Sequence, residues 1–337
     1  MKAPSVQVSP VGRDKPLLVR TTTCIVRPMR SLRSYDLDDI RRLAPMAEMI
    51  EALRVAFAAH PKHIPRQHLH AGEGEFLIMP AIDPRTAGVK LVMIQPKNAD
   101  RGLPVIQGTY VLFDAVEGRP VALFDGAALT LLRTPAASAV ATNALARQDC
   151  RSLGLIGSGP QGRGHFAAML AVRPHLDQVI VASRTTANAS RAAQELSAPG
   201  VTVRVGDISD AAACDIVCVG TRSTEPLVTA AMVRPGAHIN AVGAYRLDMR
   251  ELAADLVDIA TVTVDDLDAA QAEAGDLALA VSEQSFAWNR VRADLVSLST
   301  GEWSRRSEHE VTIFKSVGLA FEDLVVARQV ATKDGLL

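Results

Sequence analysis

A glycine-rich turn near the middle of the chain carries the clearest chemical signal. Gly157, Gly159 and Gly162 have the spacing G-x-G-x-x-G and directly follow the short apolar stretch Leu153–Ile156. In a strand, turn and helix with this spacing, free N–H groups and the positive end of the helix dipole meet phosphate groups, because glycine lets the backbone come close. The motif alone is weak, but the apolar strand before it and the helical stretch Gly162–Val172 after it strengthen it.

We therefore predict that a nicotinamide dinucleotide binds at this turn. The alternative is a glycine-rich turn that binds nothing. The turn residues assigned to the cofactor are Gly157, Ser158, Gly159, Pro160, Gln161 and Gly162.

The end of the next predicted strand bears on which dinucleotide binds. A site for NAD usually carries an acidic residue there, which bonds the ribose 2′-hydroxyl. This chain has Ser183, Arg184 and Thr185 instead. An arginine between two hydroxyl groups can hold a 2′-phosphate by charge-assisted hydrogen bonds. We predict that NADP(H) is preferred and that NAD(H) is possible; the alternative for Arg184 is a solvated surface charge.

The segments around the turn indicate an α/β protein. A chain of 337 residues is long for a single core, so two domains are expected. Beyond residue 134, strand-like and helical segments alternate, which is typical of a doubly wound parallel sheet of the Rossmann type. The predicted strands are Ser152–Ile156, Gln178–Ala182, Val201–Val205, Ile216–Val219, His238–Val242 and Thr261–Val264, and the predicted helices are Gly162–Val172, Asn188–Leu196 and, last, Phe314–Val330.

The first part of the chain has a different pattern. Apolar residues recur at helical spacing from Asp36 to Ala59, which predicts one helix, or two helices broken near Pro45. After it, short apolar segments separated by turn-like stretches predict an antiparallel, hairpin-rich sheet. These strands are Phe76–Met79, Val89–Ile94, Gly108–Asp114 and Val121–Phe124.

The composition is that of an ordinary globular protein, with 48% apolar residues, 22% charged residues and a net charge of −1. It favours neither nucleic acid nor an anionic membrane as partner, and no apolar run reaches the roughly 20 residues of a membrane span. The four cysteines suit buried core thiols in a reducing compartment, so we expect a cytoplasmic protein. Residues 1–31, rich in Lys and Arg, predict a loosely ordered N-terminal extension, with a targeting role as the alternative.

A group of histidines lies in a predicted loop without the spacing of a metal site. They are His60, His63, His68 and His70. We therefore predict no metal ion.

Several longer stretches resemble one known family. The segment Ala127–Arg147 is similar to the Leu-Thr and Arg-Thr signature of the ornithine cyclodeaminase/mu-crystallin family. Three more stretches agree in the family's order, namely Gly88–Val92, Gly236–Gly243 and Thr312–Leu324. On these stretches the chain is identified as a member over roughly residues 32–330.

The resemblance implies a fold and an assembly. It implies a Rossmann doubly wound parallel sheet inserted into an α+β substrate-binding and dimerisation domain with an antiparallel sheet. The boundaries would be 1–31 for the extension, 32–133 plus 305–330 for the substrate-binding and dimerisation domain, and 134–304 for the Rossmann domain. It also implies a homodimer.

The resemblance further implies an α-amino or α-imino acid as substrate, with its carboxylate held by Arg66, Lys90 and Arg133. The residue types suit this role, because arginine offers a planar bidentate fork and lysine a compact point charge. Lys90 interrupts an otherwise apolar strand, where a lone ammonium is costly without a partner. The alternatives are a solvated strand-edge lysine at Lys90 and unrelated structural arginines at the other two positions. We also assign Thr134, Thr221, Val242 and Gly243 to the cofactor site.

Two positions depart from the cyclodeaminases of the family. Leu77 stands where they have the glutamate that reaches the distal amine, and Tyr245 stands where they have a catalytic aspartate. Asp248 follows a few residues later, where the reductase-like members also tend to have an acid. The pattern looks more like the reductase and mu-crystallin branch of the family.

That branch implies reduction of a cyclic ketimine, such as Δ1-pyrroline-2-carboxylate or Δ1-piperideine-2-carboxylate, to an L-amino acid by NADPH. Leu77 then forms an apolar wall for the ring. Lys90, Arg133 and Tyr245 are the catalytic candidates, and a water near Tyr245 or Lys90 handles the proton.

Three other functions stay open. The chain could oxidise an open-chain amino acid, as the alanine dehydrogenase-like members do. It could be an ornithine or lysine cyclodeaminase with relocated acids. It could also be a ligand-binding protein without turnover, like mu-crystallin.

Overall fold

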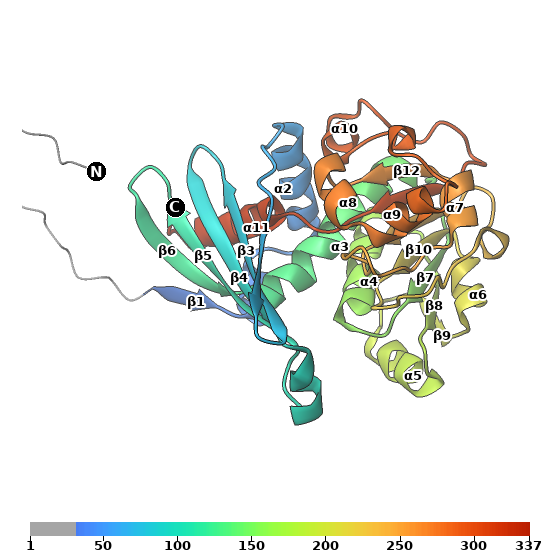
Figure 1. Cartoon of the computed structure of the whole chain (residues 1–337), viewed down its shortest axis with the longest axis horizontal. Helices are drawn as coiled ribbons and strands as arrows, with labels where there is room; N and C mark the ends of the chain where they lie inside the picture. Colours follow the sequence, from blue (N-terminus) through green and yellow to red (C-terminus); the bar gives the residue numbers. More distant parts are fainter. Residues whose placement is uncertain (1–31) are drawn as a thin grey trace, which may run out of the picture. The chain divides into compact units, whose positions relative to one another are not determined.

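The computed structural model describes residues 32–337, and these fold around two β-sheets (Figure 1). The predicted extension 1–31 lies outside the described residues. One sheet has six strands and the other has seven. The predicted α/β fold, with one antiparallel sheet and one doubly wound parallel sheet, is confirmed.

The six-stranded sheet is antiparallel except at one edge, where β1 pairs parallel with β6. Its strands in spatial order are β1 (Arg33–Tyr35), β6 (Arg119–Asp125), β5 (Ile106–Asp114), β4 (Thr86–Ile94), β3 (Gly74–Ile82) and β2 (Gln67–Ala71). The predicted strands lie within β3, β4, β5 and β6. The prediction missed β1 and β2, so His68 and His70 lie on an edge strand rather than in a loop. β2 is short and mostly exposed, so it lacks the apolar alternation that predicts a strand.

Three helices contact this sheet, namely α1 (Leu37–Leu43), α3 (Gly126–Leu145) and α11 (Ala320–Lys333), and α2 (Met46–Ala58) packs on α3 and α11. The break predicted near Pro45 is confirmed, since α1 ends at Leu43 and α2 begins at Met46. α11 packs against β3, β4 and β5, on the face of the sheet that carries Lys90 and Met79 (Figure 1). A helix from the C-terminal end of the chain therefore covers strands from its first third.

The seven-stranded sheet is parallel. In spatial order it contains β12 (Thr261–Val264), β13 (Thr312–Lys315), β11 (His238–Ala241), β10 (Ile216–Val219), β7 (Ser152–Ile156), β8 (Gln178–Ala182) and β9 (Thr202–Val205). The helices of this part are α4 (Pro160–Val172), α5 (Thr186–Glu195), α6 (Ile208–Ala212), α7 (Ala254–Ile259), α8 (Leu267–Glu273), α9 (Gly275–Ser282) and α10 (Leu295–Thr300).

The predicted helix Phe314–Val330 is wrong in its first part. Residues Thr312–Lys315 form the fully buried strand β13 between β11 and β12, and the helix α11 begins only at Ala320. Gly318 separates them with φ +79, a conformation that glycine adopts without strain. A short strand that is buried on both faces cannot be told from a buried helix by periodicity.

The helix α3 joins the two sheets. It contacts β5 and β6 on one side and β11 and β13 on the other (Figure 1). It runs without a break through Arg133 and Thr134, where the domain boundary was predicted. β13 pairs within the parallel sheet, while α11 packs on the six-stranded sheet. The division at 32–133 plus 305–330 and 134–304 remains a prediction.

Two further expectations concern bulk properties. Among residues 32–337, no helix is both long and apolar enough to cross a membrane. Cys150, Cys214 and Cys218 are buried free thiols, as predicted, and Cys24 lies outside the described residues.

Candidate functional site

The glycine turn joins β7 to α4 at the point where the parallel sheet reverses its strand order. β7 lies between β8 and β10, and in such sheets ligands bind outside the carboxyl ends of the strands at this point. Gly157 has φ +113, and a Cβ on Gly162 would stand 1.9 Å from the Gly157 carbonyl oxygen. Both positions therefore require glycine for the fold itself.

Gly159 differs from the other two glycines of the motif. It is the N-cap of α4, and a Cβ placed on it would meet nothing within 4 Å. The protein leaves open space at this position, directly before the first free N–H groups of the helix. A pyrophosphate fits there, because its oxygens can accept from those N–H groups.

Two of the three residues predicted to meet the 2′-position of the cofactor, Ser183 and Thr185, use their hydroxyl groups in contacts within the protein. The hydroxyls of Ser158 and Ser183 are hydrogen bonded at 2.8 Å, which ties the glycine turn to the end of β8. Thr185 caps α5 by accepting from the N–H of Asn188. Arg184 is exposed between them, and within residues 32–337 it forms no ion pair. Its guanidinium is thus available to a ligand.

The predicted cofactor residues Thr221 and Gly243 are joined by a carboxylate that the sequence reasoning missed. Glu251 is fully buried and accepts from the Thr221 N–H at 2.6 Å and from its hydroxyl at 2.7 Å. Its other oxygen accepts from the N–H of Gly243 at 2.7 Å and of Ala244 at 3.2 Å. Glu251 therefore fixes the loops after β10 and β11 against each other.

Glu251 is itself held in a buried charged cluster. Asp276 accepts from the Glu251 N–H at 2.6 Å and lies 3.0 Å from the ammonium of Lys315 on β13. Burial raises the pKa of Glu251 to about 7, Lys315 lowers it and Asp276 raises it further. The signal that could have revealed this cluster is a charged residue inside an apolar run, as at Lys315 in Ile313-Phe314-Lys315.

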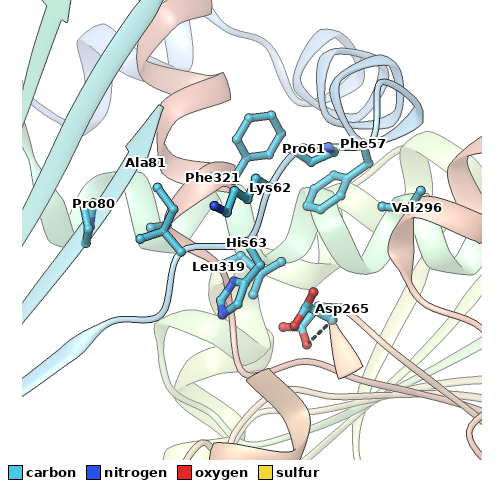
Figure 2. Close-up of a pocket in the computed structure, with 13 residues that line it drawn as sticks. Phe57, Pro61, Lys62, His63, Pro80, Ala81, Asp265, Val296, Leu319 and Phe321 are labelled. Atoms are coloured by element: carbon cyan, nitrogen blue, oxygen red, sulfur yellow. Dashed lines mark hydrogen bonds between the residues drawn. The ribbon is translucent and has the colours of Figure 1, made fainter. Parts of the chain in front are cut away.

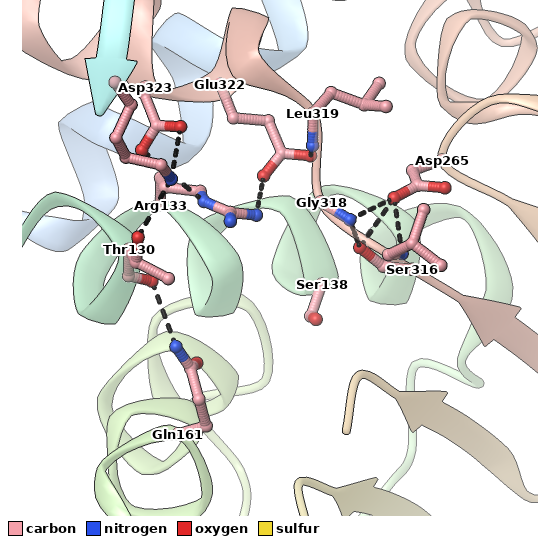
Figure 3. A network of polar contacts seen from close by, with 12 residues as sticks. Thr130, Arg133, Ser138, Gln161, Asp265, Ser316, Gly318, Leu319, Glu322 and Asp323 are labelled. Atoms are coloured by element: carbon pink, nitrogen blue, oxygen red, sulfur yellow. Dashed lines mark hydrogen bonds and ion pairs between the residues drawn. The ribbon is translucent and has the colours of Figure 1, made fainter. Parts of the chain in front are cut away.

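On the substrate side, Lys90 is buried on the inner face of β4. Its ammonium donates to Asp323 at 2.7 Å and to the Thr130 hydroxyl at 3.0 Å (Figure 3). Burial lowers the pKa of Lys90 to about 8, Asp323 opposes the shift, and the nearby Arg133 and Arg66 lower it further. A solvated strand-edge lysine is therefore excluded at this position.

Arg133 is buried on α3, near the first turn of α11, which carries Glu322 and Asp323. Its guanidinium donates to Glu322 at 2.7 Å and lies 3.7 Å from Asp323 (Figure 3). Burial lowers the pKa of Arg133, but Glu322 and Asp323 outweigh this and the pKa is raised. The Nε atom of Arg133 and one oxygen of Asp323 are buried without a hydrogen-bond partner among the described residues. These two atoms face each other at 3.7 Å, so they interact as an ion pair that is too long for a hydrogen bond.

Arg66 approaches from the segment before β2. It donates to the carbonyl oxygens of Val317, at 3.0 Å, and Gly318, and pairs with Glu273 at 3.0 Å. The loop that carries those carbonyls is held by Asp265, whose carboxylate accepts from Gly318 at 2.7 Å (Figure 3). The structure thus brings Arg66, Lys90 and Arg133 together, although they lie on three separate segments.

The surroundings of this cluster are partly apolar. Leu77 is buried on β3, on the same face of the strand as Met79, and Met79 pairs with Lys90 of β4. Tyr245 follows β11, and burial raises the pKa of its hydroxyl, while Arg66 is close enough to lower it. Asp248, in contrast, is exposed and pairs with Arg246 at 2.7 Å. It does not enter the cluster.

A small pocket borders the same loop on its other side. Figure 2 shows Phe57 and Phe321 at this pocket, with His63 and Asp265 near each other. None of the predicted site residues lines this pocket, although Asp265, which holds the Gly318 loop, does. Within residues 32–337, no three His, Cys, Asp or Glu side chains are grouped so that they could hold a metal ion.

Comparison with known proteins places this architecture in a family. The model of the ornithine cyclodeaminase/mu-crystallin family matches residues 35–334. The chain belongs to this family.

Individual members of the ornithine cyclodeaminase/mu-crystallin family narrow the relation. A Δ1-pyrroline-2-carboxylate reductase of Bacillus cereus is 38% identical over 261 residues, which cover 75% of this chain and 79% of that protein. The structure of a Thermococcus litoralis Δ1-pyrroline-2-carboxylate reductase with NADH and L-proline is similar with a TM-score of 0.85 and 32% identity, covering 90% of this chain and 97% of that one. An archaeal alanine dehydrogenase dimer with bound NAD has a TM-score of 0.83 and 30% identity, with 90% and 95% coverage. The predicted likeness to the reductase branch is confirmed.

Proposed function

We propose that this chain reduces a cyclic imino acid, of the Δ1-pyrroline-2-carboxylate or Δ1-piperideine-2-carboxylate type, to the L-amino acid with a reduced nicotinamide dinucleotide. The observation that carries the proposal is the convergence of Arg66, Lys90 and Arg133 beside the apolar Leu77. Cations suit the carboxylate of the substrate, and an apolar wall suits its ring. The relation to the Thermococcus litoralis reductase, whose structure contains NADH and L-proline, supports it.

The charged side chains would bind and orient the substrate. An ammonium has three N–H donors, and Lys90 uses two of them within the protein, which leaves one for a carboxylate oxygen. Arg133 donates to Glu322 and its Nε lies 3.7 Å from Asp323, so the terminal N–H groups that Glu322 does not use remain for the carboxylate. Holding the carboxylate at two points fixes the neighbouring carbon, which is the atom that must be placed for reduction.

A reduced dinucleotide bound at the glycine turn would supply the hydride. Hydride addition to a protonated imine carbon leaves a neutral ring amine, which then takes a proton to give the product. We assign delivery of this proton to a water held near Tyr245 or Lys90. Tyr245 keeps its proton at neutral pH, since burial raises its pKa, so it can donate a hydrogen bond to that water. Cyclic imines carry a proton in part near neutral pH, so a strong general acid is unnecessary.

Consumption of the reduced cofactor with each cyclic imine tests this proposal. We expect turnover of at least one imine, and none of ornithine or lysine with ammonia release. Oxidation of open-chain amino acids with NADP⁺ is the competing activity, as in alanine dehydrogenases. Absence of turnover with both imines would overturn the proposal, and cofactor binding without any turnover would favour a ligand-binding protein.

We further propose that NADP(H) is the preferred cofactor, held at its 2′-phosphate by Arg184, Ser183 and Thr185. The guanidinium of Arg184, which is exposed and has no ion pair among residues 32–337, supports this. An Arg184→Ala variant is expected to lose about tenfold or more in kcat/KM with NADPH and little with NADH. Arg191 of α5, also a positive charge of this part of the chain, is mutated as the control. A wild-type preference for NADH would contradict the proposal; the Thermococcus litoralis structure contains NADH.

We also propose that two copies pair through the six-stranded sheet. The outer face of this sheet, opposite α11, is apolar over three strands: Phe76, Ile78 and Ile82, then Val89, Leu91 and Met93, then Val111 and Phe113. No helix of residues 32–337 covers this face in Figure 1. Light scattering should give a dimer, and Leu91→Asp should give a monomer.

A further inference from the structure

Thr130 on α3 stands between the lysine of the substrate site and the glycine turn of the cofactor site. Its hydroxyl oxygen is 3.0 Å from the Lys90 ammonium, and its carbonyl oxygen is 3.2 Å from the Gln161 side-chain nitrogen (Figure 3). We infer that Thr130 is a positioning residue that aims Lys90 at the substrate carboxylate and sets its distance from the cofactor turn. The inference rests on the proposed function for the identity of the substrate.

The direction of the hydrogen bond between Thr130 and Lys90 follows from the number of hydrogen atoms that each group carries. The Thr130 hydroxyl has one proton, and it donates this proton to the Gly126 carbonyl at 2.9 Å. Its lone pairs are therefore directed to Lys90, which must be the donor. With Asp323 as the second acceptor, two of the three ammonium protons of Lys90 have fixed directions. The direction of the third is then determined, and it is the one left for a ligand.

The link to the cofactor side uses different atoms of the same residue. Gln161 lies in the first turn of α4, directly after Gly159 and Pro160. Its amide donates to the Thr130 main chain, while its own side-chain oxygen is buried without a partner among residues 32–337. One residue of α3 thus contacts the lysine with its side chain and the cofactor helix with its backbone.

The contact also affects the charge of Lys90. The charged or titratable groups that face Lys90 are Asp323 of α11, Arg133 of α3, Arg66 before β2 and Tyr110 of β5. Burial and the two arginines disfavour the ammonium, and Asp323 favours it. The Thr130 oxygen accepts from the ammonium and so favours the charged form. Loss of this oxygen must move Lys90 further toward its neutral form.

The test compares Thr130→Val, which keeps the shape and removes the oxygen, with Thr130→Ser, which keeps the oxygen. For Thr130→Val we expect the KM of the imine to rise about tenfold or more, since a hydrogen bond to a charged group is lost. We also expect the alkaline limb of kcat/KM to move to lower pH. Thr130→Ser should restore both toward the wild-type values. The dissociation constant of the dinucleotide, from its fluorescence, should change less than twofold in either variant.

A matched control measures the cost of the helix contact itself. Thr332 of α11 donates to the Arg328 carbonyl at 2.8 Å, as Thr130 does to Gly126, but it is exposed. Thr332→Val should change thermal stability only. An unchanged imine KM and alkaline limb in Thr130→Val, or equal losses in the Val and Ser variants, would overturn the inference.

Binding of L-proline in the presence of the oxidised dinucleotide separates this inference from the proposed function. It needs no turnover, and the carboxylate of proline reports on Lys90 directly. If wild type turns over no imine but binds proline, the proposed function fails while the comparison of the Val and Ser variants still decides the role of Thr130. If wild type neither turns over imines nor binds proline, both are overturned.

Discussion

The predicted cofactor turn, Gly157–Gly162, and the predicted substrate cluster of Arg66, Lys90 and Arg133 with their acidic partners are built by opposite means. At the turn, the chemistry depends on main-chain N–H groups at the start of α4. Gly157, Gly159 and Gly162 are needed there because they have no side chain. In the substrate cluster, the groups are charged side chains that are almost fully buried and come from β4, α3, α11 and the segment before β2. The first is a local structure, and the second exists only after the chain has folded.

The two regions also differ in energetics. Free N–H groups at a helix terminus cost little while they remain accessible to water. Buried ions are costly and must be paired, as Lys90 is with Asp323 and Arg133 with Glu322. Substitutions in the substrate cluster should therefore lower both stability and activity. Substitutions in the cofactor turn should lower only the affinity for the dinucleotide, at positions where a new side chain meets open space. The predictions below test this difference.

The largest effect is expected for Lys90→Met. This variant removes the contact to the substrate carboxylate and leaves the buried Asp323 with only Arg133, at 3.7 Å, as partner among residues 32–337, so kcat/KM for the imine should fall about 10³-fold and stability by about 3–5 kcal/mol. Lys97→Met is the control, because Lys97 pairs with Glu73 on the surface at 2.5 Å and should cost at most about 1 kcal/mol. Denaturant unfolding and steady-state kinetics measure both. Equal stability of the two variants would show that the buried pair of Lys90 stabilises the fold no more than the surface pair of Lys97.

The glycines of the turn give the next largest effect, and they separate affinity from folding. In Gly159→Ala the new methyl group meets no protein atom, so stability should stay near wild type while dinucleotide affinity falls about tenfold to a hundredfold. In Gly162→Ala the methyl group would meet the Gly157 carbonyl at 1.9 Å, so stability itself should fall by about 1–3 kcal/mol. Unaltered cofactor affinity in Gly159→Ala would show that the pyrophosphate lies elsewhere.

Glu251→Gln tests a place where the cofactor region depends on a buried charge. Both oxygens of Glu251 accept from N–H or O–H donors, so an amide NH₂ must face donors at one of the two loops. We expect the KM of the dinucleotide to rise about tenfold, with a smaller change in the KM of the imine. A rise confined to the imine KM would assign Glu251 to the substrate region instead.

The smallest effect is a pH dependence. Only the ammonium form of Lys90 binds the substrate carboxylate well, and burial lowers the pKa of this residue to about 8. Charged Lys90 predominates below this value, so its contribution to kcat/KM should fall about tenfold per pH unit above it, in addition to the fall caused by loss of the imine proton. Measurement of kcat/KM between neutral and alkaline pH, with the dinucleotide saturating, tests this. An alkaline limb near the ordinary lysine value would mean that Lys90 is more solvated than its surroundings indicate.

The local features of the fold could be predicted closely. The strands Ser152–Ile156, Gln178–Ala182 and Ile216–Val219 were predicted with their observed bounds, because apolar runs between turn residues are local signals. The prediction of a helix over Phe314–Val330 was wrong in its first part. Thr312–Lys315 are four consecutive buried residues, and such a short run shows no periodicity that distinguishes a strand from a helix. Only pairing with β11 and β12 decides it.

Only one part of the candidate site, its cations, could be predicted before the structure. The three cations Arg66, Lys90 and Arg133 were assigned through the family resemblance, and their acidic partners were not assigned at all. A signal for them exists in Ala320-Phe321-Glu322-Asp323-Leu324-Val325, where two acids interrupt an apolar run and must be paired if they are buried. The sequence does not say with which cations they pair, and the same holds for Glu251.

By itself, the sequence determined the glycine turn, the alternation of strands and helices and the absence of a carboxylate at Leu77, because each depends on neighbouring residues. Only the tertiary structure decided that Lys90 has a lowered pKa, that Thr130 lies between both sites and that Glu251 joins two loops. These properties arise from burial and from contacts between distant segments. The electrostatic energy of a charged group depends on distance and surroundings, and neither is defined until the chain is folded.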